Sequence, residues 1–402
     1  MSKKLILVGF LVEPIYFESQ TKNDEYPQVA ARKLELGFLS GFLENGVEAE
    51  VFGFFPSSTF PANPRILFGY RHWLLDGAEC HRLPFINFSG LKLITRTIAL
   101  TTALLARITS VRQARAVCVY STHIPLVFSA NIIRKILKIP FYVIIPDLPE
   151  FMNVGTTRGR LHRLLKSFES KLARYLVAKS SGISSVTCYI VKDVPAWKNI
   201  PSVVIEGIAG ESPPDVPPCR HGQRPYFLYA GGLSEAYGVG SLLRAFLSSD
   251  IDAELWICGC GPLSYYVRDC ELRDSRIRYL GFLDQASLRR AQINSIALLI
   301  TRDPQEDYVR YSFPSKLIEY MTTGVPVITT RLAGIPSEYF DYVSIFESSS
   351  EDDIVSALNA HLRRSATDRE DQGLRALQFI AARRNPRVAV LPLLDLIWIK
   401  DD

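Results

Sequence analysis

Anion-binding chemistry is indicated by the segment Tyr308–Thr330, which reads YVRYSFPSKLIEYMTTGVPVITT. Ser312-Phe313-Pro314-Ser315 stands before a helical pattern, and Ser and Pro are favoured at helix starts. The free backbone N–H groups and positive dipole end of a helix start suit a diphosphate. Lys316 in the first turn opposes that dipole, which indicates that it serves an anion. Glu319, one turn on from Ser315, could accept two hydrogen bonds from ribose hydroxyls. An amphipathic helix with a solvated Lys and Glu explains the same residues equally well.

The elements that position this segment alternate between apolar runs of strand length and amphipathic runs of helix length. This alternation predicts an α/β fold with parallel sheets covered by helices on both faces. In the first half we expect a helix over Gln28–Leu43 and strands over Leu5–Val12, Glu50–Phe55, Ala116–Tyr120, Phe141–Ile145 and Val203–Ile205. In the second half we expect helices over Gly240–Leu247, over Ser315–Thr323 and after Ser350, with strands over Tyr226–Tyr229, Glu254–Cys258, Arg278–Leu280, Ser295–Thr301 and Val325–Thr329.

A proline-rich stretch at 211–224 separates the two halves, and it has four prolines within six positions. Because such a stretch cannot continue a helix or a central strand, we predict a linker there. The domains are then 1–210 and 225–385, followed by a tail, 386–402, that could pack back on the first domain. In open parallel sheets ligands bind beyond the carboxyl ends of the strands, so we expect the chemistry in loops facing a cleft between the two domains.

Charge is distributed unevenly along the 402 residues, of which 48% are apolar and 22% charged. Residues 82–198 hold 18 Lys and Arg against 4 Asp and Glu, a net charge of +14. A basic half favours an anionic partner such as a membrane surface or a phosphate-bearing lipid, although a solvated basic surface without a partner has the same composition.

Compartment is indicated by the cysteines and the first residues. The seven cysteines are odd in number and irregularly spaced, which favours a reducing compartment, and Cys258-x-Cys260 lacks the second pair of a zinc site. Lys3-Lys4 followed by Leu5–Val12 reads as a first buried strand rather than a secretory signal. The sequence has no run of about 18 uncharged apolar residues, so no spanning helix is expected. In line with the cysteine usage, we expect a cytoplasmic location.

Several segments together resemble the large retaining glycosyltransferase family four, which has the GT-B fold of two Rossmann-like domains whose parallel sheets face each other across a cleft. The branch most similar builds bacterial capsule, exopolysaccharide or O-antigen chains. The segments that carry the resemblance are Tyr229–Leu233 (YAGGL) with Tyr237–Val239, Leu255–Pro262 (LWICGCGP), Tyr279–Phe282 (YLGF), and Tyr311–Pro326 continuing into Leu332–Tyr342.

The resemblance assigns donor-binding roles in the second domain. Glu319 matches the glutamate that binds the donor ribose, whereas Tyr311 stands where relatives have a glutamate for the transferred sugar. Gly232 and Tyr237 stand where relatives carry an Arg and a Lys on the diphosphate, so we expect Lys316 first, and otherwise Arg302 or Arg310, to supply the cation. The remaining implied residues are Gly231, Ser312, Phe313, Pro314 and Ser315 on the donor and Gly259, Gly261 and Phe282 on the base side.

Catalytic candidates in the first domain follow its strands. His123 in YSTHIP resembles the His-x-Pro of relatives, where the histidine lies beside the reacting sugar; otherwise a lone His after a strand is more often structural. Asp147, at the end of another strand, could orient the acceptor hydroxyl, or it could simply form a turn before Leu-Pro. We interpret Glu13–Pro27, which contains Glu18, Asp24 and Glu25, as a long polar loop facing the acceptor.

The segment Phe85–Ile108 is apolar, and Lys92 and Arg96 lie one turn apart on one face of a predicted helix. Such a helix can lie in a membrane interface, or it can be a domain helix with a basic outer stripe. Relatives take up lipid-diphosphate-linked acceptors at the inner leaflet, which implies an anionic membrane surface as a partner and a peripheral location.

The function predicted from these features is retaining, metal-independent transfer of a sugar from a nucleotide-sugar to a hydroxyl of a lipid-linked saccharide, without a cofactor. Glu351-Asp352-Asp353 is interpreted as a helix start rather than a metal site. The alternatives are a GT-B nucleotide-sugar 2-epimerase and a non-catalytic nucleotide-sugar binding subunit, the latter because expected charged residues are missing. Charge alone suggests a nucleic-acid binder, but no recognised module with interleaved basic and aromatic residues is present, so no nucleic-acid partner is predicted.

Overall fold

The chain forms two compact units, each built around its own sheet. The computed structural model describes residues 3–21, 28–148, 160–210 and 224–398. Unit 1 comprises Met1–Ile208 together with Pro386–Asp402, and unit 2 comprises Ala209–Asn385. Of the predicted linker 211–224, only Arg224 lies among the described residues. None of the described helices combines the length and apolar character that a membrane crossing requires.

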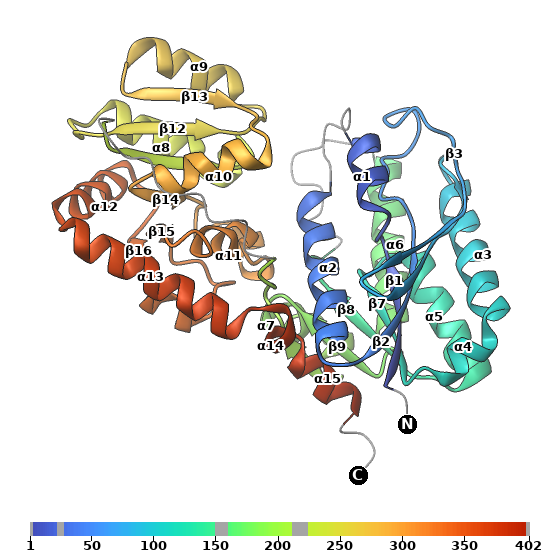
Figure 1. The fold of residues 1–402 in the computed structure, drawn as a ribbon. Helices are drawn as coiled ribbons and strands as arrows, with labels where there is room; N and C mark the ends of the chain where they lie inside the picture. Colours follow the sequence, from blue (N-terminus) through green and yellow to red (C-terminus); the bar gives the residue numbers. More distant parts are fainter. Residues whose placement is uncertain (1–2, 22–27, 149–159, 211–223, 399–402) are drawn as a thin grey trace. The chain divides into compact units, whose positions relative to one another are not determined.

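Unit 1 contains an eight-stranded sheet with the order β10-β9-β8-β7-β1-β2-β5-β4, in which only the β4–β5 pair is antiparallel (Figure 1). Its strands are β1 (Lys4–Gly9), β2 (Glu48–Gly53), β4 (Arg71–Leu75), β5 (Ala78–Arg82), β7 (Ala116–Tyr120), β8 (Phe141–Ile145), β9 (Gly182–Ser185) and β10 (Ser202–Val204), and β3 (Leu67–Phe68) pairs separately with β6 (Phe85–Ile86). Its helices are α1 (Pro14–Thr21), α2 (Val29–Glu44), α3 (Leu91–Ala106), α4 (Ile108–Gln113), α5 (Ile124–Leu137), α6 (Arg160–Val177), α7 (Cys188–Lys192), the 3₁₀ helix η1 (Pro195–Trp197), α14 (Pro386–Ala389) and α15 (Leu391–Trp398).

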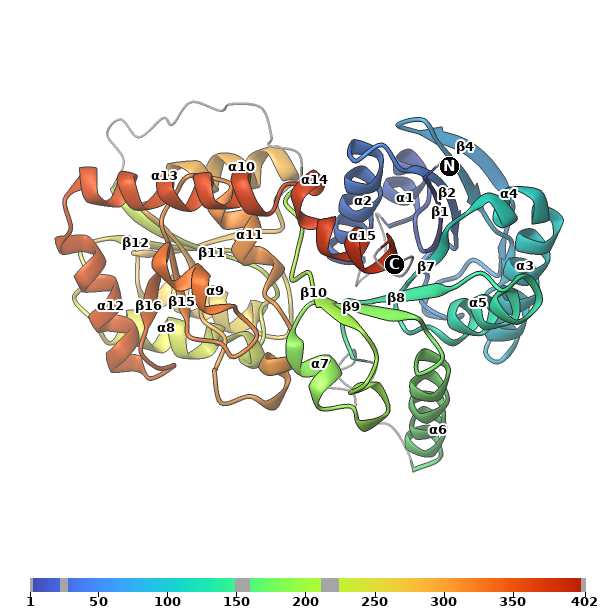
Figure 2. The ribbon, with the colours of Figure 1, turned by 90° about the horizontal axis from the view of Figure 1, so that it is seen from below.

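Helices cover both faces of this sheet, because the central strands are apolar on both sides. Alternate strand residues, such as Leu5, Leu7 and Cys118, pack in one cluster with α2 and α15. The opposite face is covered by α3, α5 and α6, and α3 lies beside α5 (Figure 2). The C-terminal helices α14 and α15 therefore belong to the core of unit 1.

Unit 2 contains six parallel strands in the order β13-β12-β11-β14-β15-β16. They are β11 (Tyr226–Ala230), β12 (Glu254–Cys258), β13 (Ile277–Gly281), β14 (Ala297–Ile300), β15 (Val327–Thr330) and β16 (Ser344–Phe346). The helices are α8 (Val239–Leu247), α9 (Ser264–Arg273), α10 (Gln285–Asn294), α11 (Ser315–Met321), α12 (Glu351–Arg363) and α13 (Ala366–Arg383), with 3₁₀ helices η2 (Glu235–Tyr237), η3 (Asp307–Tyr311) and η4 (Ser337–Asp341).

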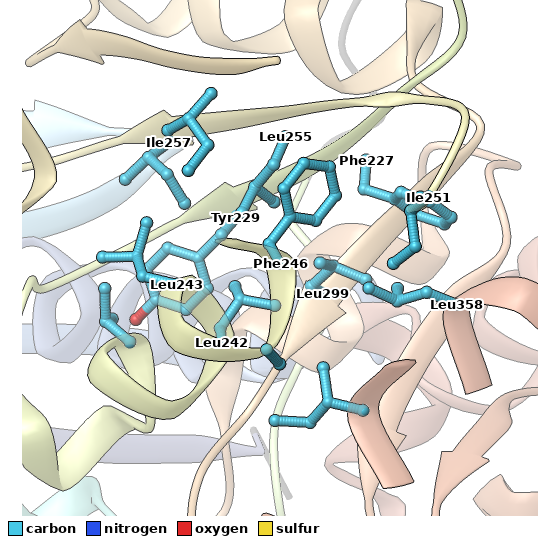
Figure 3. Close-up of a cluster of buried hydrophobic side chains, with 14 of the residues drawn as sticks. Phe227, Tyr229, Leu242, Leu243, Phe246, Ile251, Leu255, Ile257, Leu299 and Leu358 are labelled. Carbon is cyan, nitrogen blue, oxygen red and sulfur yellow. The ribbon is translucent and has the colours of Figure 1, made fainter. Parts of the chain in front are cut away.

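The core of unit 2 forms where α8 and α12 pack on the sheet. Figure 3 shows Leu242, Leu243 and Phe246 of α8 in one cluster with Phe227, Tyr229 and Leu255 of the strands. The α8 residues recur at helical spacing, so one face of the helix is buried. This face packs on the strands whose loops form the site.

Strand bounds agree with the sequence prediction where an apolar run is short and continuous, as in β7, β8 and β12. Strand β1 is shorter than predicted, because it ends at Gly9 rather than Val12. The next residue, Phe10, donates its backbone N–H to both carboxylate oxygens of Glu35, at 3.0 and 3.1 Å. The ladder therefore stops where a side chain replaces the neighbouring strand as hydrogen-bond acceptor.

The predicted polar loop Glu13–Pro27 is wrong in its first half, since Pro14–Thr21 form helix α1. The reason is apolar anchoring that its polar composition obscures: Phe17 is buried, and the Tyr16 ring meets Phe55 edge-on at 5.6 Å. Asp24 and Glu25 lie outside the described residues.

Candidate functional site

The loops after neighbouring strands of unit 2 touch one another at the carboxyl edge of the sheet. A Cβ atom added to Gly259, which follows β12 and has φ +134°, would lie 1.9 Å from the carbonyl oxygen of Gly231, which follows β11. Likewise, a Cβ at Gly261 would lie 2.4 Å from the Leu233 oxygen. Only glycine permits this approach. Beyond β13, Phe282 is 80% exposed, so its ring is free to stack on a ligand.

Arg302, which follows β14, is a cation at this edge. Its guanidinium carbon lies 5.0 Å from the centroid of the Tyr237 ring and 6.0 Å from that of Tyr308. Its Nη1 lies 3.4 Å from Ser312 Oγ, and its carbonyl oxygen accepts a 2.6 Å hydrogen bond from Thr330. A guanidinium held against aromatic faces keeps its charge and loses little further freedom on binding an anion.

Position 232 is closed to a side chain, because a Cβ there would lie 2.9 Å from Cε2 of the Tyr237 ring. The resemblance described above places an arginine at 232 and a lysine at 237. In this chain the Tyr237 ring occupies that space and also supports Arg302. Sequence reasoning missed Tyr308, whose ring also lies beside Arg302.

Helix α11 begins at Ser315, as the sequence predicts, with Pro314 at its N-cap and no side-chain capping bond. Lys316 Nζ lies 3.1 Å from Glu319 Oε1, and Gln292 donates to the same oxygen at 3.2 Å. The two charged residues singled out for donor binding therefore contact each other, and both are partly exposed. An ion pair of this exposure is weak, so a ligand can replace either partner.

The position of α11 is fixed by Tyr320. Its buried hydroxyl donates to the carbonyl oxygen of Ala230 at 2.9 Å and accepts from the Ala230 N–H at 3.0 Å. The turn before the helix is fixed by Phe313, which is buried against the Tyr339 ring at 5.4 Å. These contacts hold the Ser312–Ser315 turn beside Arg302. Phe313 acts here as an anchor, and Arg310 lies over the Tyr311 ring at 5.3 Å.

A second group of residues lies in unit 1, at the carboxyl ends of the neighbouring strands β1, β7 and β8. Phe10 follows β1, and its ring meets that of His123 edge-on at 5.5 Å. His123 follows β7 at the N-cap of α5, after Ser121, which has the strained φ of 79°. Asp147 follows β8, and its charge, after burial and Glu35, raises the pKa of Tyr120. The structure thus brings His123 and Asp147 to one sheet edge.

His123 is held as a neutral imidazole. Burial, followed by the charges of Arg96 and Lys92, lowers the pKa of His123 well below its usual value. Its Nδ1 is buried and has no hydrogen-bond partner among the described residues. A neutral ring with an unused nitrogen can accept or donate one hydrogen bond to a sugar hydroxyl.

The predicted basic outer stripe of α3 is wrong, because Lys92 and Arg96 face inward. Arg96 is 3% exposed, with the Phe85 ring 4.2 Å from its guanidinium carbon, and it donates to the Phe55 carbonyl at 2.8 Å. Lys92 donates to the Ser57 carbonyl at 2.6 Å. Carbonyl acceptors and aromatic faces, neither of which is visible in the helix sequence, draw the two cations into unit 1.

Glu35 on α2 was missed by sequence reasoning. It is 0% exposed and holds the loop after β1 through the Phe10 N–H. Burial raises the pKa of Glu35 to about 8, against the lowering effect of the Phe10 and Leu11 N–H groups and of Arg32. The sequence contains one indication of this role, because Glu35 stands among the apolar residues of a helical pattern, Lys33–Phe38 (KLELGF).

Metal-ligand spacing occurs once among the described residues, at His72, Glu79 and His81 of the β4–β5 hairpin. Arg107 Nη1 lies 3.2 Å from Glu79 Oε2 and 3.2 Å from Glu50 Oε1, so a guanidinium already neutralises this cluster. Glu351-Asp352-Asp353 forms the first turn of α12 behind the Ser350 N-cap, which confirms the predicted helix start.

In a comparison with known proteins, residues 224–364 match the model of the family described as Glycosyl transferases group 1. No curated protein sequence matches the chain. Among solved structures, sucrose-phosphate synthase from Thermosynechococcus elongatus is 13% identical with a TM-score of 0.65, covering 98% of each chain. The lipopolysaccharide outer core galactosyltransferase WaaB is 16% identical with a TM-score of 0.61 over 99% of each chain. HepE of Anabaena in complex with UDP is 12% identical with a TM-score of 0.63 over 98% of each chain. These matches confirm the predicted α/β fold of the GT-B type.

Proposed function

We propose that the chain is a glycosyltransferase that moves a sugar from a nucleotide-sugar to a hydroxyl of a lipid-linked saccharide in surface polysaccharide biosynthesis, and the match of residues 224–364 supports this proposal. The observation that carries the proposal is the arrangement in unit 2, where Arg302, Ser312 and Glu319 stand around one turn at the carboxyl edge of a parallel sheet. Open parallel sheets bind nucleotides at this edge.

Donor recognition divides among three parts of this arrangement. Arg302 and the Ser312–Ser315 turn face the diphosphate, where a fixed cation and backbone N–H groups neutralise its charge. Glu319 accepts hydrogen bonds from the ribose hydroxyls, and Lys316, released from Glu319, becomes a second cation for the phosphates. The exposed Phe282 and the glycines Gly259 and Gly261 leave room for the base.

The proposed reaction retains the configuration of the sugar. The bond between the anomeric carbon and the diphosphate oxygen breaks, and the electron pair stays on the nucleoside diphosphate, where Arg302 stabilises it. The acceptor hydroxyl attacks the anomeric carbon from the same face, and its proton passes to the departing diphosphate oxygen. No metal is required, because protein groups supply the positive charge, so transfer is expected to persist in EDTA.

The acceptor is expected to bind at the unit 1 group. His123 is neutral and offers hydrogen bonding without charge, and Asp147 can orient a sugar hydroxyl. The net charge of +14 over 82–198 supports an acceptor that carries phosphate and an association with an anionic membrane surface on the cytoplasmic side.

The first experiment is a thermal-shift scan of nucleotide-sugars, because a bound donor raises the unfolding temperature by mass action. The stabilising donor is then incubated with undecaprenyl-diphosphate-linked saccharides, and product is measured by mass spectrometry and its anomer by NMR. Stabilisation without product from any acceptor would indicate a binding subunit. Formation of an epimer from the donor alone would establish an epimerase instead.

A further inference from the structure

The outer face of α3 is free of charge, which its sequence alone does not reveal. The helix contains two charged residues, Lys92 and Arg96, and both turn inward. The residues that point outward include Leu91, Ile94 and Ile98, which are 45%, 57% and 57% exposed. Their spacing of three and four places them on one stripe along the helix.

The polar groups that accompany this stripe are satisfied within the helix. Thr102 donates its hydroxyl to the carbonyl of Ile98 at 2.8 Å, and Thr95 donates to the carbonyl of Leu91 at 2.8 Å. A threonine hydroxyl that bonds to its own helix has a hydrogen-bond partner without water. The hydroxyls of Thr95 and Thr102 therefore do not require water as a hydrogen-bond partner beside the apolar stripe.

The neighbouring helix α5 continues the apolar surface. Thr101 of α3 donates to Ser129 of α5 at 2.9 Å, and Figure 2 shows the two helices side by side on one face of the sheet. On α5, Phe128 and Ile136 are 41% and 56% exposed and lie two turns apart on one face. Scattered exposed apolar residues are ordinary, but a patch shared by two adjacent helices marks an interaction surface.

The segment of the chain that contains α3 and α5 carries charge of a single sign. Residues 83–146 contain eight Lys and Arg and no Asp or Glu, and the eight are Lys92, Arg96, Arg107, Arg112, Arg115, Arg134, Lys135 and Lys138. Arg134, Lys135 and Lys138, at the end of α5, line one hollow together with Pro140 and Ser181. Exposed apolar side chains on α3 and α5, together with these cations at the end of α5, match the interface of an anionic lipid bilayer.

We propose that the outer faces of α3 and α5 form a docking surface for an anionic lipid bilayer, with Leu91, Ile94, Ile98, Phe128 and Ile136 entering the interface. Lys135 and Lys138 meet the headgroups. The inner face of α3 carries Lys92 and Arg96 beside His123, so one helix separates the bilayer from the acceptor group. A lipid-linked acceptor could then remain anchored while its sugar reaches His123; this last point rests on the proposed function, whereas the docking surface does not.

The test is flotation of the full-length protein with vesicles of phosphatidylglycerol and phosphatidylcholine, without donor or acceptor. We expect binding that weakens with added salt and that is lost on vesicles of phosphatidylcholine alone. The double substitution Ile94→Gln and Ile98→Gln is expected to weaken binding at least about tenfold, because two buried apolar side chains are removed from the interface. Lys135→Gln with Lys138→Gln should reduce binding mainly at low salt.

The matched control is Tyr265→Gln with Leu272→Gln on α9, since these side chains are each 87% exposed but lie in unit 2, away from the basic segment. The control should bind vesicles like the unchanged protein. Failure of the unchanged protein to bind would overturn the proposal, as would equal binding by the α3 variant and the control. Sedimentation velocity tests whether a second copy of the chain binds this surface instead. A dimer that the α3 substitutions convert to monomer would assign the surface to a second copy of the chain. Donor-induced thermal stabilisation should persist in every variant. A failure of membrane docking can therefore be distinguished from a failure of the proposed donor binding.

Discussion

The Arg302 guanidinium rests on the ring of Tyr237, at 5.0 Å from its centroid, while a Cβ at Gly232 would strike that same ring at 2.9 Å. One tyrosine thus closes position 232 to a side chain and supports Arg302, the residue that we propose as the cation at the diphosphate. A diphosphate leaving group requires a positive charge nearby, but the residue that carries this charge can follow any of the neighbouring strands.

Arg302→Ala is therefore expected to lower kcat/KM for the donor by about 100-fold, the usual cost of removing a group that stabilises developing charge. Arg302→Lys should recover part of this loss, because a lysine keeps the charge without the planar stack on Tyr237. Steady-state kinetics with varied donor checks both. An unchanged kcat/KM in Arg302→Ala would assign the diphosphate to Lys316 or Arg310.

Glu319→Ala is expected to weaken donor binding by about 100-fold, since a carboxylate with two ribose hydrogen bonds is lost and Lys316 loses its partner. Isothermal titration with the stabilising nucleotide-sugar measures the effect. Glu338→Ala is the control, because Glu338 also forms an ion pair in unit 2, with Arg384, but lies on η4. Equal affinities in the two variants would contradict the ribose assignment.

Tyr320→Phe is expected to destabilise unit 2 by roughly 2–4 kcal/mol, because the buried N–H and C=O of Ala230 both lose their partner. Tyr226→Phe is a graded control: its buried hydroxyl donates to the Ala291 carbonyl at 2.7 Å, and the loss of this bond should cost about half as much. Urea unfolding and hydrogen exchange at the Ala230 amide report the difference. Equal costs would show that Tyr320 does not fix α11 in the way described.

Buried strands could be predicted from the sequence because burial on both faces leaves a continuous apolar run. This explains why Glu254–Cys258 is a strand in both the prediction and the structure. The short strands over 67–86 could not be predicted, because β4 is an edge strand with exposed Arg71 and His72 and has no apolar pattern.

The direction of a helix face was the harder problem. Spacing alone shows that Lys92 and Arg96 share a face, but it does not show which side that face meets. The answer depended on the Ser57 and Phe55 carbonyls and the Phe85 ring, which lie elsewhere in the sequence. The turn Ser312–Ser315 and Glu319 were predictable because they are local, whereas Tyr308 and Glu35 act through contacts between distant segments.

The buried Glu35 couples the loop after β1 to pH. Its pKa is about 8 in the folded protein against an ordinary value near 4.5. Between these values the unfolded chain has lost the proton and the folded chain has kept it, so the unfolded state binds fewer protons and stability falls as pH rises. The slope approaches about 1.4 kcal/mol per pH unit in this window and vanishes above the folded pKa.

Glu35→Gln keeps an acceptor for the Phe10 N–H but does not titrate, so the variant should gain stability relative to the unchanged protein as pH rises from 5 to 8. Urea unfolding at each pH measures this difference, and taking the difference cancels the contributions of other groups common to both proteins. Glu44→Gln, at the exposed end of the same helix, should show no such trend. A pH-independent difference for Glu35→Gln would mean that Glu35 is already ionised at pH 5, and its Phe10 contact would then be a charged hydrogen bond that fixes the loop at every pH.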